Sequence, residues 1–133
     1  MQKGFNLIEL LIAMVIIAIL SLLIYPSYNS YFIRAHRNLG IIALSDASGR
    51  IEEYYTRHNS YAGATPSNLK LNNAAINGYY IMSITAKNNT YTLSAIPQGK
   101  QAAKDAGCGT LMIDQFGNKS VSGKLATNEC WNN

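Results

Sequence analysis

The stretch that decides the fold is KGFNLIELLIAM, residues 3–14. It opens an apolar run that continues to Ile24 and yet carries Glu9 near its start. From Leu7 onward the run is almost entirely Leu, Ile, Val, Ala and Met, and only Ser21 interrupts it further on. A carboxylate within hydrocarbon costs about 2.5–3.5 kcal/mol or more. We therefore expect Glu9 to be functional and to pair with a positively charged group.

The apolar run has the length of a membrane-spanning helix. From Phe5 to Ile24 there are 20 residues, and a helix of that length measures about 30 Å, which just spans a bilayer core. No A-x-A cleavage site follows the run, so we expect a retained transmembrane helix rather than a secretory signal that is removed after it. Lys3 lies before the run and Arg34 and Arg37 lie after it, so basic residues alone do not orient the helix.

The rest of the chain is large enough for one small domain. The whole chain has 133 residues, a net charge of +4 and 14% charged residues, which is basic but not by itself typical of nucleic-acid binding. Cys108 and Cys130 are its two cysteines. Such a pair behind a membrane segment predicts one disulfide in an oxidising compartment, which places the C-terminal domain outside the cytoplasm and the N-terminus inside.

Two other uses of the cysteines are disfavoured. A zinc site would also need His36 and His58, which lack the short paired spacing of structural zinc ligands. A redox centre is disfavoured because there is no C-x-x-C pair.

The segment after Pro26 has the period of an amphipathic helix, and Pro26 itself predicts a kink. Together with the apolar run, this predicts one long helix from Phe5 to His58, of about 80 Å. Gly40 and Gly49 weaken it and indicate close packing or flexible points. The apolar stripe consists of Tyr28, Phe32, Ala35, Leu39, Ala43, Ala47, Ile51 and Tyr54, and the polar face carries Arg34, Arg37, Asp46, Arg50, Glu53 and Arg57.

Beyond the loop that follows this helix, apolar residues recur at every second position, as in a β-strand. The segments GYYIMSIT (78–85) and TYTLSAIP (90–97) are rich in β-branched and aromatic residues and predict a hairpin. GTLMIDQFGNKSVSG (109–123) predicts a second hairpin with its turn at Gln115 to Asn118. Four antiparallel strands packed on the amphipathic helix give an α+β fold.

These strings together resemble the type IV pilins, and among them the PilE-type pilins of Gram-negative bacteria, many of which are minor subunits. The N-terminal string GFNLIEL resembles the class III signal of prepilins, while YPSYNSYFIRAHR, RIEEYYTRHNSYA, CGTLMIDQFGNKS and ECW resemble the smaller group. The resemblance implies that a prepilin peptidase cuts between Gly4 and Phe5 on the cytoplasmic side and N-methylates Phe5. Asn6 departs from the family, in which Thr is commoner at this place.

The resemblance also implies a partner for Glu9. In pilus filaments the glutamate at this place pairs with the N-terminal amine of an adjacent subunit, which here is the amine of Phe5. Pairing of two charges within a bundle of apolar helices fixes the stagger between subunits. We therefore assign filament assembly to Phe5, Glu9 and Pro26. The alternative is that Glu9 lies at the membrane interface, where the dipole of the first helical turn favours it.

The resemblance implies a type IV pilin fold with a long kinked N-terminal helix, a four-stranded antiparallel sheet and a disulfide-bounded C-terminal region. We expect a leader at 1–4, a transmembrane and filament-core half-helix at 5–25, and a head domain at 26–133. The head comprises a half-helix at 26–58, a loop at 59–78 and the sheet and disulfide region at 79–133.

The implied function is that of a structural subunit of a pilus used for adhesion, twitching motility or DNA uptake. The precursor is expected in the inner membrane, with its N-terminus cytoplasmic and its head periplasmic, and the assembled subunit in the extracellular pilus. Implied partners are other pilins, the prepilin peptidase and the inner-membrane assembly platform. A type II secretion pseudopilin is the alternative assembly role, disfavoured because no D-x-D-x-D-G calcium string is present.

A second class of function is binding at the filament surface, as a DNA receptor or an adhesin. Six lysines lie beyond Leu69, at positions 70, 87, 100, 104, 119 and 124. Among them Lys100, Lys104, Lys119 and Lys124 are the candidate contacts, and Tyr79, Tyr80 and Tyr91 are candidates for base stacking. The alternative is that the lysines are ordinary solvated residues and that the tyrosines lie in the sheet core.

A third class, an enzyme, is disfavoured. The sequence has no G-x-S-x-G, no metal-binding string and no phosphate loop, so we expect no catalytic residues, metal or cofactor. Asp105, Asp114 and Glu129 are expected to be turn and surface residues.

Overall fold

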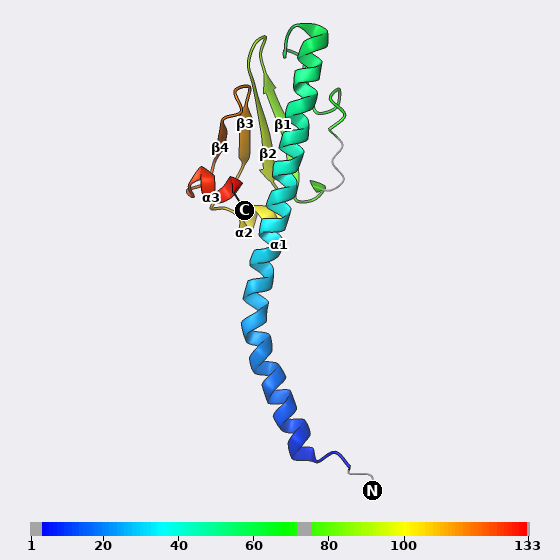
Figure 1. Cartoon of the computed structure of the whole chain (residues 1–133), viewed down its shortest axis with the longest axis vertical. Coiled ribbons are helices and arrows are strands. Elements are labelled where there is room, and N and C mark those ends of the chain that lie inside the picture. Colours follow the sequence, from blue (N-terminus) through cyan, green and yellow to red (C-terminus); the bar gives the residue numbers. More distant parts are fainter. Residues whose placement is uncertain (1–3, 72–75, 133) are drawn as a thin grey trace. The chain divides into compact units, whose positions relative to one another are not determined.

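The computed structural model describes residues 4–71 and 76–132, apart from the side chains at 26 and 27 (Figure 1). The elements follow the order α1 (Leu7–His58), β1 (Tyr80–Ala86), β2 (Tyr91–Pro97), α2 (Gly99–Lys104), β3 (Leu111–Asp114), β4 (Lys119–Val121) and α3 (Thr127–Trp131).

The chain divides into two compact units, one up to Phe32 and one from Ile33 onward. Residues 1–3 of the predicted leader and 72–75 of the predicted loop lie outside the described residues. The predicted kink at Pro26 and the predicted domain boundaries stay predictions.

Both ends of α1 have a local cause. The helix begins at Leu7, two residues after the predicted start, because the Asn6 carbonyl accepts the first helical hydrogen bonds, from the amides of Glu9 at 3.0 Å and Leu10 at 3.3 Å. It ends at His58, as predicted. Asn59 follows with φ of 52°, and its amide donates to a carbonyl of the last turn. A left-handed Asn after the last helical residue is a common way to end a helix.

The buried stripe of α1 is rotated from the predicted one. Ala43, Ala47 and Ile51 are buried as predicted, but Leu44 is also fully buried. Gly40 is buried as well, and a Cβ there would lie 3.4 Å from the Tyr80 ring, at ordinary van der Waals distance. Gly49 has open space around it. Tyr28 and Phe32 belong to the first unit, where both are exposed and their rings contact each other edge to face.

The four strands form an antiparallel sheet in the order β1-β2-β3-β4, as the two predicted hairpins require. Register pairs such as Met82↔Ala95 and Ala95↔Leu111 place alternate residues of neighbouring strands in rows on one face. That face is buried in the same core as the stripe of α1, whereas the cross-strand pair Ile81↔Ile96 is exposed. The predicted α+β fold is confirmed.

The C-terminal region is held by a disulfide. Cys108 and Cys130 are both fully buried and form a bridge with a Cα–Cα distance of 5.7 Å. Beside it, the Gly123 amide donates to the Cys108 carbonyl at 3.0 Å. A Cβ at Gly123 would lie 2.0 Å from the Gly107 carbonyl oxygen, so only glycine fits there. The zinc alternative is wrong because both thiols are used in the disulfide.

The short helices α2 and α3 were not predicted. Each has no more than six residues, which is too few for a hydrophobic period to show in the sequence.

Candidate functional site

The N-terminal segment before α1 is open to the surroundings. Gly4, Phe5 and Asn6 precede the helix, and Phe5 is 81% exposed. Apart from the adjoining residues, no atom of the described part of the chain lies within 4 Å of the place where a Cβ on Gly4 would be. The bond between Gly4 and Phe5 is therefore accessible in a non-helical backbone, which is the form of chain that a peptidase needs.

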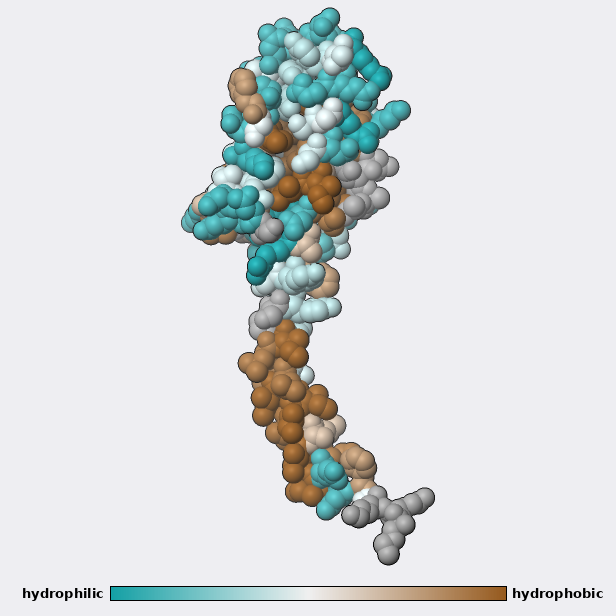
Figure 2. All heavy atoms as spheres, in the orientation of Figure 1, coloured by the Kyte–Doolittle hydropathy of each residue, from teal (hydrophilic) through white to brown (hydrophobic). Residues whose placement is uncertain are grey.

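The first unit exposes nearly all of its apolar side chains. Figure 2 shows a continuous run of hydrophobic side chains along this part of α1. Leu7, Leu22 and Leu23 are each at least two-thirds exposed. By length and composition, α1 contains a stretch able to cross a membrane, and none of that stretch is buried.

Glu9 lies in the first turn of α1 within this apolar surface. Its side chain is exposed, and within the part of the chain that the structure describes it makes no ion pair. Its backbone amide donates to the Asn6 carbonyl. The geometry therefore leaves the carboxylate open to a partner, and it is equally compatible with the interfacial position.

A buried polar cluster lies at the start of the second unit and was missed by the sequence reasoning. Arg37 donates from Nε to Asp105 Oδ2 at 2.9 Å and from Nη2 to Asp105 Oδ1, so the pair is bidentate. Both side chains are less than 10% exposed. The hydrogen bond to Asp105 raises the pKa of Arg37, against the opposing effect of burial. Arg37 was predicted on the polar face and Asp105 at the surface, and both predictions are wrong.

Gln101 of α2 connects this ion pair to the rest of the head. Its Nε2 lies 3.0 Å from the Ile33 carbonyl oxygen, 3.0 Å from the Tyr80 hydroxyl and 3.1 Å from Asp105 Oδ2. Burial raises the pKa of Tyr80 to about 12. The cluster thereby joins α1, β1 and the end of α2 through polar contacts in the interior.

One sequence signal could have found Arg37. Ile33, Arg37, Gly40, Leu44 and Ala47 recur at spacings of three and four, and Ile51 continues the series. This series follows the face of α1 that is buried in the head. An arginine within a buried series needs an acid, and nothing local in the sequence identifies Asp105, 68 positions away, as that acid.

The four candidate lysines are exposed but lie on different elements. Lys100 and Lys104 lie one turn apart on α2, Lys119 lies on β4, and Lys124 lies between β4 and α3. The Lys119 Nζ lies 5.1 Å from the centre of the Trp131 ring, in a cation–π arrangement. All four lysines thus lie on the surface, and Lys119 also contacts the Trp131 ring.

Of the three candidate tyrosines, two are buried and one is partly exposed. Tyr80 and Tyr91 are buried in the core of the head, as the alternative interpretation held, so neither face is open to a base. Tyr79 is 38% exposed, and its ring stacks on that of His36 at 3.7 Å between centres.

Asp114 is a turn residue, as predicted. Its carboxylate accepts from the amides of Phe116 and Asn118, each at 2.9 Å, and from the side chain of Asn118. The hydrogen bond from the Asn118 side chain is the main cause that lowers the pKa of Asp114. Glu129 is exposed on α3, also as predicted.

Two family models match adjacent parts of the chain. A model described as the prokaryotic N-terminal methylation motif matches residues 1–25. A model described as "Type IV minor pilin ComP, DNA uptake sequence receptor" matches residues 26–112.

Several curated proteins are similar in sequence. A fimbrial protein of Neisseria meningitidis serogroup B is 34% identical over 69% of this chain and 54% of its own length. The type IV major pilin protein PilE1 of Neisseria gonorrhoeae is 33% identical over 69% of this chain and 43% of its own length. The chain spans about half the length of these Neisseria relatives.

The type IV major fimbrial protein FimA of Dichelobacter nodosus is 30% identical over 96% of this chain and 74% of its own length. Among solved structures, the non-core minor pilin PilV of Neisseria meningitidis covers 68% of this chain and 94% of its own, with a TM-score of 0.45 and 17% identity, a likeness too weak to bear on the assignment. The family models and the sequence relatives agree: the chain belongs to the type IV pilins, in the group described by the ComP minor-pilin model.

Proposed function

We propose that the chain is a subunit of a type IV pilus, made as an inner-membrane precursor and then assembled into a surface filament. The observation that carries this proposal is the match of residues 1–25 to the N-terminal methylation motif, joined directly to a pilin head. The exposed apolar surface of the first unit supports it, because such a surface needs either lipid or other copies of the same helix to cover it.

The first step is processing of the precursor. A prepilin peptidase cuts between Gly4 and Phe5 on the cytoplasmic side, and the new amine of Phe5 is methylated. Before and after the cut the head lies in the periplasm, where the disulfide Cys108–Cys130 is stable.

The second step is extraction from the membrane by the inner-membrane assembly platform. The apolar half of α1 then packs among the same segments of other pilin subunits. The carboxylate of Glu9 pairs with the amine of Phe5 on a neighbouring subunit, because each charge needs an opposite one once both leave water. This pairing fixes the stagger between subunits.

Mass spectrometry of sheared filaments tests the proposal. We would express the chain in its source bacterium after deletion of the chromosomal gene, then compare the N-terminal peptide of sheared pili with that of the membrane fraction. We expect methylated Phe5 as the N-terminal residue in filaments. Filaments whose subunits retain Met1 would contradict the proposal.

A second candidate function is that of a DNA receptor on the filament. The specific observation is the ComP model, whose description names a DNA uptake sequence receptor, together with four exposed lysines in the C-terminal half of the head. Lys100 and Lys104 lie within the matched residues, and Lys119 and Lys124 lie beyond them. Such lysines bind phosphates, and the buried positions of Tyr80 and Tyr91 leave Tyr79 as the remaining candidate for base stacking.

A gel shift at several salt concentrations tests this second function. The full chain in detergent is mixed with duplex DNA, and the variant K100Q/K104Q is compared with R34Q/K87Q, which makes the same change of charge at two exposed basic residues elsewhere. We expect weaker binding and a shallower salt slope for the first variant only. Equal losses in both variants, or no binding at low salt, would overturn it, and an adhesin role would then be the surviving surface function.

A further inference from the structure

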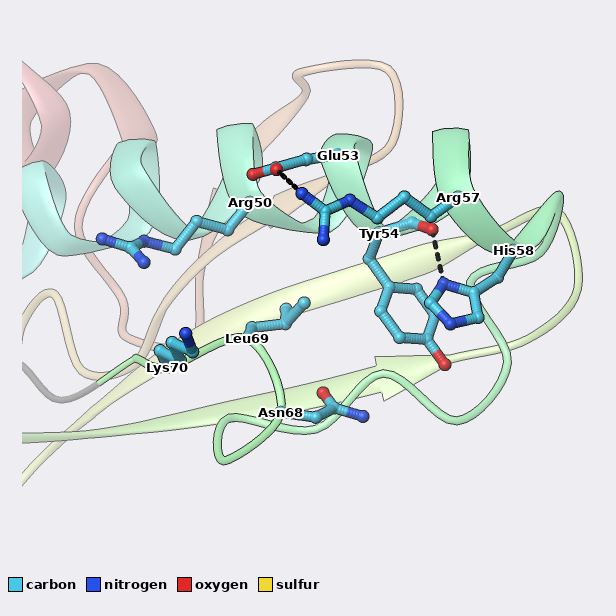
Figure 3. Close-up of a pocket in the computed structure, with 8 residues that line it drawn as sticks. All are labelled: Arg50, Glu53, Tyr54, Arg57, His58, Asn68, Leu69 and Lys70. Atoms are coloured by element: carbon cyan, nitrogen blue, oxygen red, sulfur yellow. Dashed lines mark hydrogen bonds and ion pairs between the residues drawn. The ribbon is translucent and has the colours of Figure 1, made fainter.

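A concave pocket lies between the last turns of α1 and the loop that follows, away from all residues discussed so far as DNA contacts. It has a volume of about 440 Å³, and residues 50–58 form one wall and residues 68–70 the other (Figure 3). This volume is within the usual range for small-molecule sites. Nothing in the pilus role described above uses it.

The loop wall of the pocket is fixed in place. The Asn68 side chain accepts from the Thr65 amide at 2.7 Å and donates to the Gly63 carbonyl at 2.8 Å. Tyr54, on α1, donates from its hydroxyl to the Ala62 carbonyl at 3.3 Å. Leu69 is buried. The pocket is therefore formed before any ligand arrives.

An aromatic pair forms part of the helical wall. The rings of Tyr54 and His58 stack at 4.1 Å between centres with 17° between their planes. The His58 Nδ1 lies 2.9 Å from the Tyr54 carbonyl oxygen, and because a carbonyl only accepts, this nitrogen donates. Figure 3 shows the two rings side by side, extending from α1 toward the loop that carries Asn68.

The charges of the pocket are unbalanced. Arg57 pairs with Glu53 and Arg50 pairs with Asp46, which leaves Lys70 as the excess positive charge of the pocket. Arg50 donates from Nε to Asp46 at 2.8 Å, and within the part of the chain that the structure describes its two terminal amino groups make no hydrogen bond or ion pair. Over the same residues Lys70 makes no ion pair.

The end of a helix does not account for all of these cations. Basic residues in a last turn stabilise the helix dipole, which explains Arg57 and His58. Arg50 lies two turns earlier, where it pairs with Asp46, and Lys70 comes from a separate segment, the turn at residues 66–71. Lys70, with φ of 53°, takes the left-handed position that closes this turn, in which the Leu71 amide donates to the Pro66 carbonyl at 2.9 Å.

We propose that this pocket binds a small phosphate monoester, with the phosphate between Arg50 and Lys70 and the organic part beside the Tyr54–His58 pair. Guanidinium and ammonium groups are the usual ligands of phosphate, and a flat aromatic wall suits a sugar or another ring. The phosphate monoester comes either from a free metabolite or from a phosphorylated sugar of a cell-surface glycan, and both present the same phosphate group. The inference is independent of the DNA-receptor function.

Titration of the ¹⁵N-labelled full chain in detergent micelles by NMR tests the proposal, with glucose 1-phosphate, inorganic phosphate and glucose as probes. We expect saturable shifts at the amides of residues 50–58 and 68–70 with glucose 1-phosphate, weaker binding of inorganic phosphate, and none with glucose. K70Q and R50Q should each weaken binding by at least about tenfold, as loss of a charge-assisted hydrogen bond implies.

The matched control is K87Q, which removes one exposed lysine from the turn between β1 and β2 and should change affinity less than twofold. Equal losses in K87Q and K70Q, or shifts spread over the head, would mean non-specific attraction and overturn the proposal. No saturable shift of the unaltered chain with either glucose 1-phosphate or a phosphorylated glycan would also overturn it. Binding of a phosphorylated glycan but not of glucose 1-phosphate would support the glycan as the source.

Discussion

The two parts of α1 use their apolar side chains in opposite ways. Before Phe32 the leucines and isoleucines are exposed, whereas after Ile33 a stripe that includes Leu44, Ala47 and Ile51 is completely buried. One helix therefore contains two kinds of segment. The first buries its apolar side chains only against lipid or other molecules, and the second buries them in the core of the head when the chain folds. The difference teaches that assembly and folding depend on separate sets of residues, which mutations can separate.

The largest expected effect on folding comes from the buried ion pair of the head. Arg37→Leu leaves Asp105 buried without its partner, and we expect a loss of about 3–5 kcal/mol of unfolding free energy. The double variant R37M/D105L removes both charges and should recover most of that loss. Urea unfolding of the full chain in detergent, followed by the fluorescence of its single tryptophan, Trp131, measures both.

The control for this prediction is Arg34→Leu, which removes an exposed arginine three residues earlier on the same helix. It should cost less than about 0.5 kcal/mol. If Arg34→Leu and Arg37→Leu lower the unfolding free energy equally, the buried ion pair does not stabilise the head more than an exposed arginine does.

A pair of leucines compares the two parts of α1 directly. Leu44 is fully buried, so Leu44→Ala should cost about 2–5 kcal/mol of unfolding free energy. Leu22 is 77% exposed, so Leu22→Ala should leave the unfolding of the head unchanged. The same urea experiment distinguishes them. If Leu22→Ala destabilises the head as much as Leu44→Ala, the separation of folding from assembly is wrong.

The two leucines also show what the sequence could and could not predict. The apolar run, the end of α1 and both hairpins follow from local patterns in the sequence, and the disulfide follows from the presence of just two cysteines behind a membrane segment. Leu44, Arg37 and Asp105 do not, because the rotation of a helix about its axis depends on which distant residues pack against it. A buried arginine is indistinguishable in sequence from one on a polar face until its partner is known.

The disulfide is expected to contribute less than the buried pair. Its cysteines are 22 residues apart, and closing a loop of that length stabilises by about 3 kcal/mol in the chain-entropy model. The double variant C108S/C130S should lower the urea midpoint of the head accordingly while leaving the membrane insertion of the first unit intact. Membrane fractionation checks the second point, and loss of insertion would contradict it.

The smallest effect is the response of the head to alkaline pH. Burial raises the pKa of Tyr80 to about 12, and burial is also the main cause that raises the pKa of Tyr61 to about 12. The ordinary tyrosine pKa is about 10, so the unfolded state loses these protons first. The resulting stability is present below pH 10 and is lost as the pH rises from 10 to 12.

Urea midpoints across this pH range check the prediction, and the loss should be shallower in the variant Y61F. If Y61F loses as much stability between pH 10 and 12 as the unaltered chain, the raised pKa of Tyr61 does not contribute to the effect.

The measurement that tests the central claim most directly is the fate of Glu9→Val in the source bacterium after deletion of the chromosomal gene. Sheared filaments and membrane-retained subunit are assayed separately, and the N-terminus at Phe5 is examined in each. We predict that the variant is processed and stays in the membrane but does not enter filaments, because the amine of Phe5 lacks its partner. Normal incorporation of Glu9→Val into filaments would contradict the account and leave Glu9 as an interfacial carboxylate.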